Sequence, residues 1–342
     1  MLYVTTKSNI DSYTAARALA EDRSPDGGFY VPLRLPRLDD RQIIRLGENL
    51  FSQNVADVVN CFFGSRLDSW SVEFAIGRYP VKLISVTNRE VVAETWHNPT
   101  WKFERLARGI EKAILQSDKI NACPSDWLMI VSRIAVLFGI FGELIRDGAG
   151  TPLDIALPSG DFSGPMAAWY AREMGLPIRN ILCCCNDNNA AWRLLHKGEL
   201  RTDTAAVSTS TPKCDHAVPR GLERLVFGTL GPGAACTFVQ SCSHGNTFYL
   251  EPDQQEKLRK GMYAPVTGTR RLESAVCNLY QNWKYLPDPY TALCYSGILD
   301  YRSVTGEGRK VLIISEESPE FSLDFLSRAL GMSPWELKKR MQ

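Results

Sequence analysis

The stretch LDIALPSGDFSGPMAAWYAREMGLPIRNILCCC, residues 153–185, decides the fold of this chain of 342 residues. Its first residues, Leu153 to Leu157, predict a buried strand, and Ile178 to Cys185 predict a second strand. Between them a loop rich in Gly and Ser, Pro158 to Pro165, leads into a helical segment, Met166 to Met174, which a glycine ends. A strand, a helix and a second strand in this order predict a parallel βαβ unit and hence an α/β fold.

Segments further along the chain extend this prediction. RKVLIIS at residues 309–315 predicts another buried strand, and SLDFLSRALG at residues 322–331 predicts a closing helix. The most apolar run, Asp126 to Gly148, carries Arg133 and Glu143. It therefore predicts a buried central helix and not a membrane span.

The composition excludes some classes of function. Charged residues make up 23% of the chain, hydrophobic residues make up 44%, and the formal net charge is +1. Because Lys and Arg are scattered, the sequence gives no electrostatic case for binding nucleic acid or an anionic membrane. The N-terminus has no apolar signal core, so we expect a cytoplasmic protein.

The ten cysteines predict neither a disulfide framework nor a metal site. The consecutive residues Cys183 to Cys185 lie on a predicted strand, where neighbours point to opposite faces, so they cannot form a simple disulfide framework. We expect them to be reduced, small apolar residues. Cys236, Cys242 and His244 lack a CxxC pair and a fourth ligand, so we predict no metal there.

Two segments are candidates for chemistry. The loop PSGDFSG, residues 158–164, could present backbone N–H groups and a helix N-terminus to an anion. It could equally be a tight turn, and Asp161 puts a negative charge inside it. In WHNPTWKFERLARGIEKAIL, residues 96–115, Asn98 and Pro99 suit a helix start. Taken alone, that segment predicts a capped amphipathic helix with a solvated charged face.

Seven stretches resemble, in order, motifs of threonine synthase, a pyridoxal-phosphate enzyme of fold type II. They are PDGGFYVP; HNPTWKFER (family HGPTxxFKD); LPSGDFSG (PSGNFGD); CNDNNAAWRLLHKGE (TNxND…RFLxxG); TPKCDHAVPRGLERLVF (SPAMD…NFERLL); DPYTALCY (DPHTAVA); and IISEESPEF (LSTAHPAKF). The resemblance implies an N-terminal threonine-synthase-like domain over residues 1–95. It implies a large α/β domain of the type II kind, with a parallel-rich sheet, over residues 96–342.

The resemblance also implies where a cofactor lysine should lie, and this chain has none there. The family's lysine follows the HGPT threonine by four residues, which gives Glu104 here. A carboxylate cannot form an imine, and it would repel the cofactor phosphate. Lys102 is the candidate lysine that remains, but on a helix two residues are roughly 200° of rotation, so it should point elsewhere. We therefore expect no bound pyridoxal phosphate.

Other positions of the implied site are partly kept. Asp161 stands where the phosphate loop has asparagine, Tyr290 replaces a histidine, and Glu316 falls where a threonine would help hold the pyridine nitrogen. The resemblance makes the following candidates for binding a ligand or phosphate: Ser159, Gly160, Ser163, Gly164, Arg133 and Asn186.

A whole small domain of the family is expected to be missing. In the family it lies between the lysine helix and the NWxRI helix, but here only QSDKINACPSDW, about residues 116–127, separates the two. About a dozen residues can form a connection but not a domain. We therefore expect a site that is open to water on one side.

Three functions compete on this basis. The first is a protein without pyridoxal-phosphate chemistry that serves as a non-catalytic scaffold or partner subunit in amino-acid or specialised metabolism, and we expect it to be a homodimer. The second is a repurposed enzyme for an amino-acid-like or phosphorylated small molecule. There Glu104 and Asp161 act as acid and base, Arg133 binds the anion and His97 shuttles protons. The third is a pyridoxal-phosphate lyase that uses Lys102.

Overall fold

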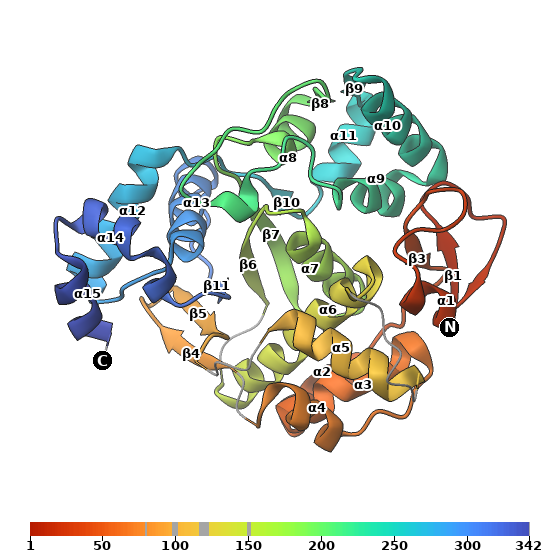
Figure 1. The fold of residues 1–342 in the computed structure, drawn as a ribbon, viewed down its shortest axis with the longest axis horizontal. Helices are drawn as coiled ribbons and strands as arrows, with labels where there is room; N and C mark the ends of the chain where they lie inside the picture. The colour runs from red at the N-terminus through yellow and green to blue at the C-terminus, as the bar shows by residue number, and fades with distance from the viewer. Residues whose placement is uncertain (79–80, 98–101, 116–122, 149–151, 342) are drawn as a thin grey trace.

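A six-stranded sheet forms the centre of the computed structural model, which describes residues 1–78, 81–97, 102–115, 123–148 and 152–341 (Figure 1). The sheet order is β10-β7-β6-β11-β5-β4, and every pairing is parallel except that of β4 with β5. In that order the strands are Met262–Tyr263, Ile178–Cys184, Leu153–Pro158, Val311–Ser315, Glu90–Glu94 and Lys82–Ser85. The predicted α/β fold with a mostly parallel sheet is confirmed.

The βαβ unit predicted from residues 153–185 is present. β6 and β7 pair in parallel, and α7 (Ser163–Glu173) connects them. The predicted strand before the C-terminal helices is β11, which lies between β6 and β5. β4 and β5 belong to this sheet as well, although the boundary expected at residue 95 places them in the N-terminal domain.

The apolar run is a core helix, α6 (Asp126–Arg146). Its length and its mean hydropathy of 2.1 would allow it to cross a bilayer, but 78% of its most apolar window is buried inside the protein. It packs closely against α3 (Phe51–Phe63), where Gly139 and Gly142 face side chains of α3. The prediction of a buried central helix is therefore confirmed.

Replacing Gly142 with alanine is expected to lower the free energy of unfolding by about 1–3 kcal/mol, because the added Cβ overpacks this contact. The new atom would lie 2.6 Å from the carbonyl oxygen of Leu46, and it would also contact the Asn54 amide that donates to this oxygen. Urea denaturation measures the change. Gly233→Ala, on α10 (Pro232–His244), meets no atom within 4 Å and is the matched control, so an equal loss there would contradict the argument.

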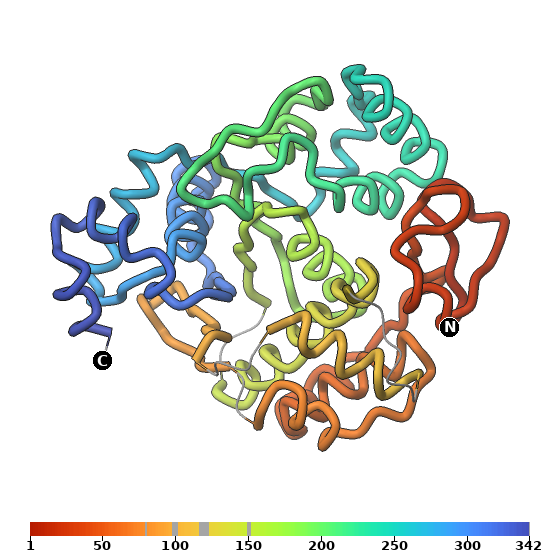
Figure 2. The backbone as a smooth tube through the Cα atoms, viewed as in Figure 1, coloured from red at the N-terminus to blue at the C-terminus, as the bar shows by residue number. Residues whose placement is uncertain are grey.

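The N-terminal segment forms its own small sheet and several helices, drawn in red and orange in Figure 2. β1 (Leu2–Thr5) lies between β2 (Tyr13–Thr14) and β3 (Tyr30–Pro32). The remaining helices of this part are α1 (Ala15–Ala20), α2 (Asp40–Arg45) and α4 (Ser69–Ile76). The Tyr3 hydroxyl donates to the Phe62 carbonyl oxygen at 2.8 Å, which ties the small sheet to α3.

Helices cover both faces of the central sheet. α6 and α7 pack on one face, whereas α12, α13 and α14 pack on the other (Figure 1). The remaining elements are α5 (Phe103–Leu115), α8 (Ala190–Trp192), a π-helix (Arg193–Lys197), β8 (Glu199–Leu200), a 3-10 turn (Pro212–Cys214), α9 (Leu222–Leu230), α10 (Pro232–His244), β9 (Phe248–Tyr249), α11 (Pro252–Arg259), α12 (Thr269–Trp283), α13 (Pro289–Thr305), a 3-10 turn (Pro319–Ser322), α14 (Leu323–Leu330) and α15 (Pro334–Met341).

The consecutive cysteines divide between these two faces. Cys183 and Cys185 belong to the core beside α6 and α7, and Cys184 belongs to the core beside α12 and α13. All three are buried and carry free thiols. The alternation predicted for neighbours on a strand is confirmed.

Candidate functional site

Two adjoining cavities, of about 540 and 800 Å³, lie at the carboxyl ends of the central strands. We call them together the cleft. Ligands of α/β proteins bind at this edge of the sheet, and both volumes suit a small molecule. The residues that line both cavities are Glu104, Met129, Arg133, Lys213, Glu316 and Glu317.

The loop between β6 and α7 forms the floor of the first cavity, and its backbone is held in an uncommon conformation. Gly160 has a φ of +47°, and the buried Phe162 has a φ of +73°, which is rare for a residue with a large side chain. The Phe162 N–H donates to the Ser159 carbonyl at 2.8 Å. The Gly221 N–H donates to the Asp161 carbonyl at 2.9 Å, so the loop is fixed from both sides.

The Asp161 carboxylate occupies one backbone N–H group of the loop that was predicted to bind an anion. The backbone N–H of Ser163 donates to its carboxylate at 2.9 Å, and the Arg220 Nε lies 3.7 Å away. Burial raises the pKa of the Asp161 carboxyl, but the hydrogen bonds from Ser163 and the charges of Arg133 and Arg220 outweigh burial and hold this pKa below its usual range. The loop therefore carries its own anion at neutral pH.

Asp161→Asn is expected to lower the Tm at pH 7, and the difference from the unaltered protein should disappear in acid. A carboxyl group whose pKa is lower in the folded protein stabilises the fold above its unfolded pKa, about 3.9. That stabilisation is lost as the pH falls through the folded pKa. Thermal unfolding between pH 7 and pH 2 measures this. A difference that stays constant over the whole range would show that the charge of Asp161 has no part in it.

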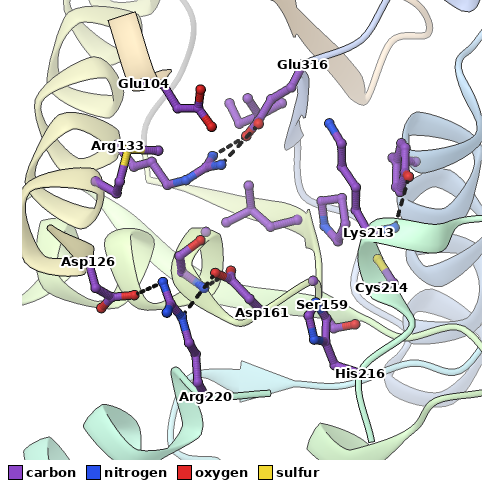
Figure 3. A pocket seen from close by; sticks show the side chains of 18 of the residues that line it. Glu104, Asp126, Arg133, Ser159, Asp161, Lys213, Cys214, His216, Arg220 and Glu316 are labelled. Atoms are coloured by element: carbon purple, nitrogen blue, oxygen red, sulfur yellow. Dashed lines mark hydrogen bonds and ion pairs between the residues drawn. The ribbon is translucent and has the colours of Figure 1, made fainter. Parts of the chain in front are cut away.

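Arg133 projects from α6 into the cleft, where a carboxylate already occupies its guanidinium. Both Nη atoms bind Glu316, one of them at 3.2 Å, and the guanidinium lies over the Phe103 ring at 4.2 Å (Figure 3). An incoming carboxylate or phosphate would have to displace Glu316. Arg133 is thus brought to the site, but it is not free for an anion.

Glu104 lies in the first turn of α5 and points toward the Arg133–Glu316 pair (Figure 3). Its side chain is exposed, and it lines both cavities. Among the residues that the structure describes, no hydrogen bond or ion pair is formed with its carboxylate. The position at which the resemblance implies a lysine therefore presents an unpaired carboxylate to the cleft.

Lys102 and His97 line only the second cavity. Lys102 precedes α5 and its carbonyl accepts hydrogen bonds from the N–H groups of Arg105 and Leu106, at 3.0 and 3.1 Å. Lys102 was expected to point away from the cofactor position because two residues on a helix differ by roughly 200° of rotation. Since Lys102 lies before the helix, that argument does not apply to it. His97 contacts Glu94 through Nε2. The expected helix start at Asn98 and Pro99 lies outside the described residues.

Asn186 does not line the cleft, although it was predicted to bind a ligand there. It is 3% exposed, and its amide group bonds to Thr209, Thr211 and Asp215 at 2.8, 2.9 and 2.7 Å. These bonds hold the segment that leads into Lys213. Of the other predicted binding residues, the first cavity is lined by Ser159, Gly160, Ser163, Gly164 and Arg133.

Two cations in the cleft were not singled out from the sequence. Lys213 forms an ion pair with Glu317 and lies 5.7 Å from the Tyr290 ring. Arg220 links Asp126 to Asp161 (Figure 3). Both cations fall within the stretch that resembles SPAMD…NFERLL. Their positive charges, within a stretch that already resembled a family motif, are the signal by which the sequence could have identified them.

Sequence comparisons identify relatives of this chain. Residues 2–77 match the family model described as threonine synthase N terminus. Threonine synthase-like 1 of Homo sapiens is 28% identical over 178 residues, and the match spans 49% of this chain and 23% of that protein. Threonine synthase of Methylobacillus glycogenes is 30% identical over 232 residues, spanning 66% of this chain and 48% of that one. The chain thus spans less than half the length of these relatives.

Solved structures give the same result for the fold. A threonine synthase from Brucella melitensis, determined with pyridoxal phosphate bound, superposes with a TM-score of 0.85 at 17% identity, covering 100% of this chain and 95% of that one. Threonine synthase from yeast gives a TM-score of 0.82 at 16% identity, covering 99% and 94%. The chain is thus similar to threonine synthases: its residues 2–77 match the model of their N-terminal region, and the whole chain has the fold of the two solved threonine synthases.

Proposed function

We propose that this protein has lost the pyridoxal-phosphate chemistry of its relatives and acts by binding, as a non-catalytic scaffold or partner subunit in amino-acid or specialised metabolism. The observation that carries the proposal is the carboxylate of Glu104 in the cleft, which has no partner in the part of the chain that the structure describes. Imine formation needs an amine with a free electron pair, which a carboxylate cannot supply.

The surroundings of Glu104 support the loss of the cofactor. The phosphate-loop N–H of Ser163 is bound to Asp161, which is ionised at neutral pH. Glu316 adds a carboxylate near the place where the resemblance puts the pyridine nitrogen, and its partner is Arg133. A dianionic phosphate would meet a carboxylate in the loop, and each such pair of like charges about 4 Å apart costs roughly 1–4 kcal/mol in a partly solvated site. These residues do not fit pyridoxal phosphate.

The connection between α5 and α6 also supports binding without catalysis. Residues 116–125 separate the two helices. Ten residues are too few to form the small domain that the resemblance implies at this point, and a site without such a domain would lack a second lobe to close over a reacting molecule.

The alternative is a repurposed enzyme. One observation supports it: Glu104 and Asp161, the predicted acid and base, line the same cavity. Asp161 is poorly suited to its part in acid–base chemistry, since a lowered pKa leaves it ionised and makes it a weak base near neutral pH. We therefore prefer binding over catalysis.

The test is retention of the cofactor. Protein incubated with excess pyridoxal phosphate and then dialysed is expected to be colourless, with no imine absorbance. The alternative in which Lys102 holds the cofactor requires a yellow protein whose colour is lost in Lys102→Ala. That result would refute the proposal.

A further inference from the structure

We propose that the cleft takes an organic ammonium ion, with its nitrogen on the Glu104 carboxylate and its alkyl groups against an aromatic wall formed by Trp96, His97 and Phe321. This inference rests on the proposed function, because it requires a cleft that is not occupied by pyridoxal phosphate. It names the class of ligand that a binding protein of this kind would take.

The first argument is the charge that remains unpaired. Arg133 is bound to Glu316, Lys213 to Glu317, and Arg220 to Asp126 and Asp161. Glu104 has no such partner among the described residues. An anion that binds Arg133, Lys213 or Arg220 must therefore break an existing ion pair, whereas a cation finds a carboxylate at Glu104 that is ready to accept it.

The second argument is the charge balance of the second cavity. Its lining has one negative charge in excess when His97 is neutral, and this count includes the exposed Lys102. The carboxylates are Glu104, Glu316, Glu317 and Glu320, and the cations are Lys102, Arg133 and Lys213. Such a surplus attracts cations and repels phosphate.

The third argument is the aromatic wall. Trp96 and His97 stack with their ring centroids 4.0 Å apart, and Phe321 lines the same cavity with 82% of its surface exposed. Aromatic faces beside a carboxylate are the chemistry by which proteins recognise ammonium groups.

Buried polar groups hold this wall in place. Glu94, which is 3% exposed, contacts His97 and also accepts a hydrogen bond from the Tyr285 hydroxyl at 2.8 Å. The Trp96 ring N–H donates to Ser315 at 3.2 Å, and the Ser315 hydroxyl donates to the buried Asp288 at 2.8 Å. The two rings are therefore positioned before any ligand arrives, which lowers the entropy lost on binding.

The experiment compares three probes of similar size by thermal unfolding at equal ionic strength: butylamine, butyrate and inorganic phosphate. Butylamine well above its Kd is expected to raise the Tm by roughly 2–4 °C, with little effect from the two anions. Glu104→Gln, which keeps the side-chain shape, should abolish the rise, and Phe321→Ala should reduce it. Glu48→Gln removes an exposed carboxylate that lies outside the cleft and should leave the rise unchanged.

The outcomes separate this inference from the function on which it rests. A rise with butyrate or phosphate that matches or exceeds the rise with butylamine overturns the inference, as does a butylamine rise that persists in Glu104→Gln. Absence of any response to butylamine also overturns it, while a colourless protein after incubation with pyridoxal phosphate would still support the proposed function. A yellow protein overturns the proposed function itself.

Discussion

A variant that combines Glu104→Lys with Asp161→Asn is expected to take up pyridoxal phosphate and turn yellow, whereas the unaltered protein stays colourless. The first change supplies an amine at the position that the resemblance assigns to the cofactor lysine. The second change removes a negative charge from the loop, while the amide oxygen of the asparagine can still accept the hydrogen bond of the Ser163 N–H, which is now 2.9 Å from the Asp161 carboxylate. Removing one like charge is worth about 1–4 kcal/mol, or roughly five- to a thousand-fold in affinity.

The matched control is Glu104→Gln with Asp161→Asn, which removes the same two acidic groups without adding an amine. It should bind the cofactor reversibly at most and lose it on dialysis. Borohydride reduction followed by peptide mass spectrometry locates the attached cofactor. Attachment at Lys102 or Lys213 in place of residue 104 would mean that the amine position has been assigned wrongly, and so would colour in the control.

The parts of the fold that were predicted correctly are the helices and strands whose own residues reveal that they are buried. β6, β7 and β11 consist mostly of apolar residues because both faces of a parallel strand are covered, and α6 is apolar because it is buried on most of its surface. β5 escaped prediction because it begins and ends with buried carboxylates, Glu90 and Glu94. Their partners include Arg302 and Tyr285, which lie about two hundred residues away.

The same distinction applies to the candidate site. The family motifs located the strand-to-helix loop and Glu104, since a motif fixes positions within one short segment. They gave no indication that Asn186 turns away from the cleft into a network with Thr209 and Asp215, or that Arg220 bridges two carboxylates. Such pairings join segments far apart in the chain, so a single sequence does not specify them.

Asp126→Asn is expected to lower the free energy of unfolding by about 3–5 kcal/mol, a loss typical of breaking a buried ion pair. Asp126 binds both Arg224 and Arg220, and Arg224 is only 1% exposed. Arg224 packs on the Phe29 ring at 4.2 Å and contacts the Tyr30 carbonyl, so it also joins the N-terminal sheet to the core. Removing the carboxylate charge leaves the buried guanidinium uncompensated.

A double-mutant cycle with Arg224→Met tests this origin of the loss. Because the methionine carries no charge, the variant with both changes should be less destabilised than the sum of the two single variants. Asp203→Asn, which removes a carboxylate from the exposed pair with Arg201, should leave stability unchanged within error. Strict additivity in the cycle would argue against a direct pair between Asp126 and Arg224.

Loss of the Asp126 carboxylate also leaves Arg220 with Asp161 as its remaining partner. A changed response of the cleft to butylamine in Asp126→Asn would therefore link this buried cluster to the ligand site.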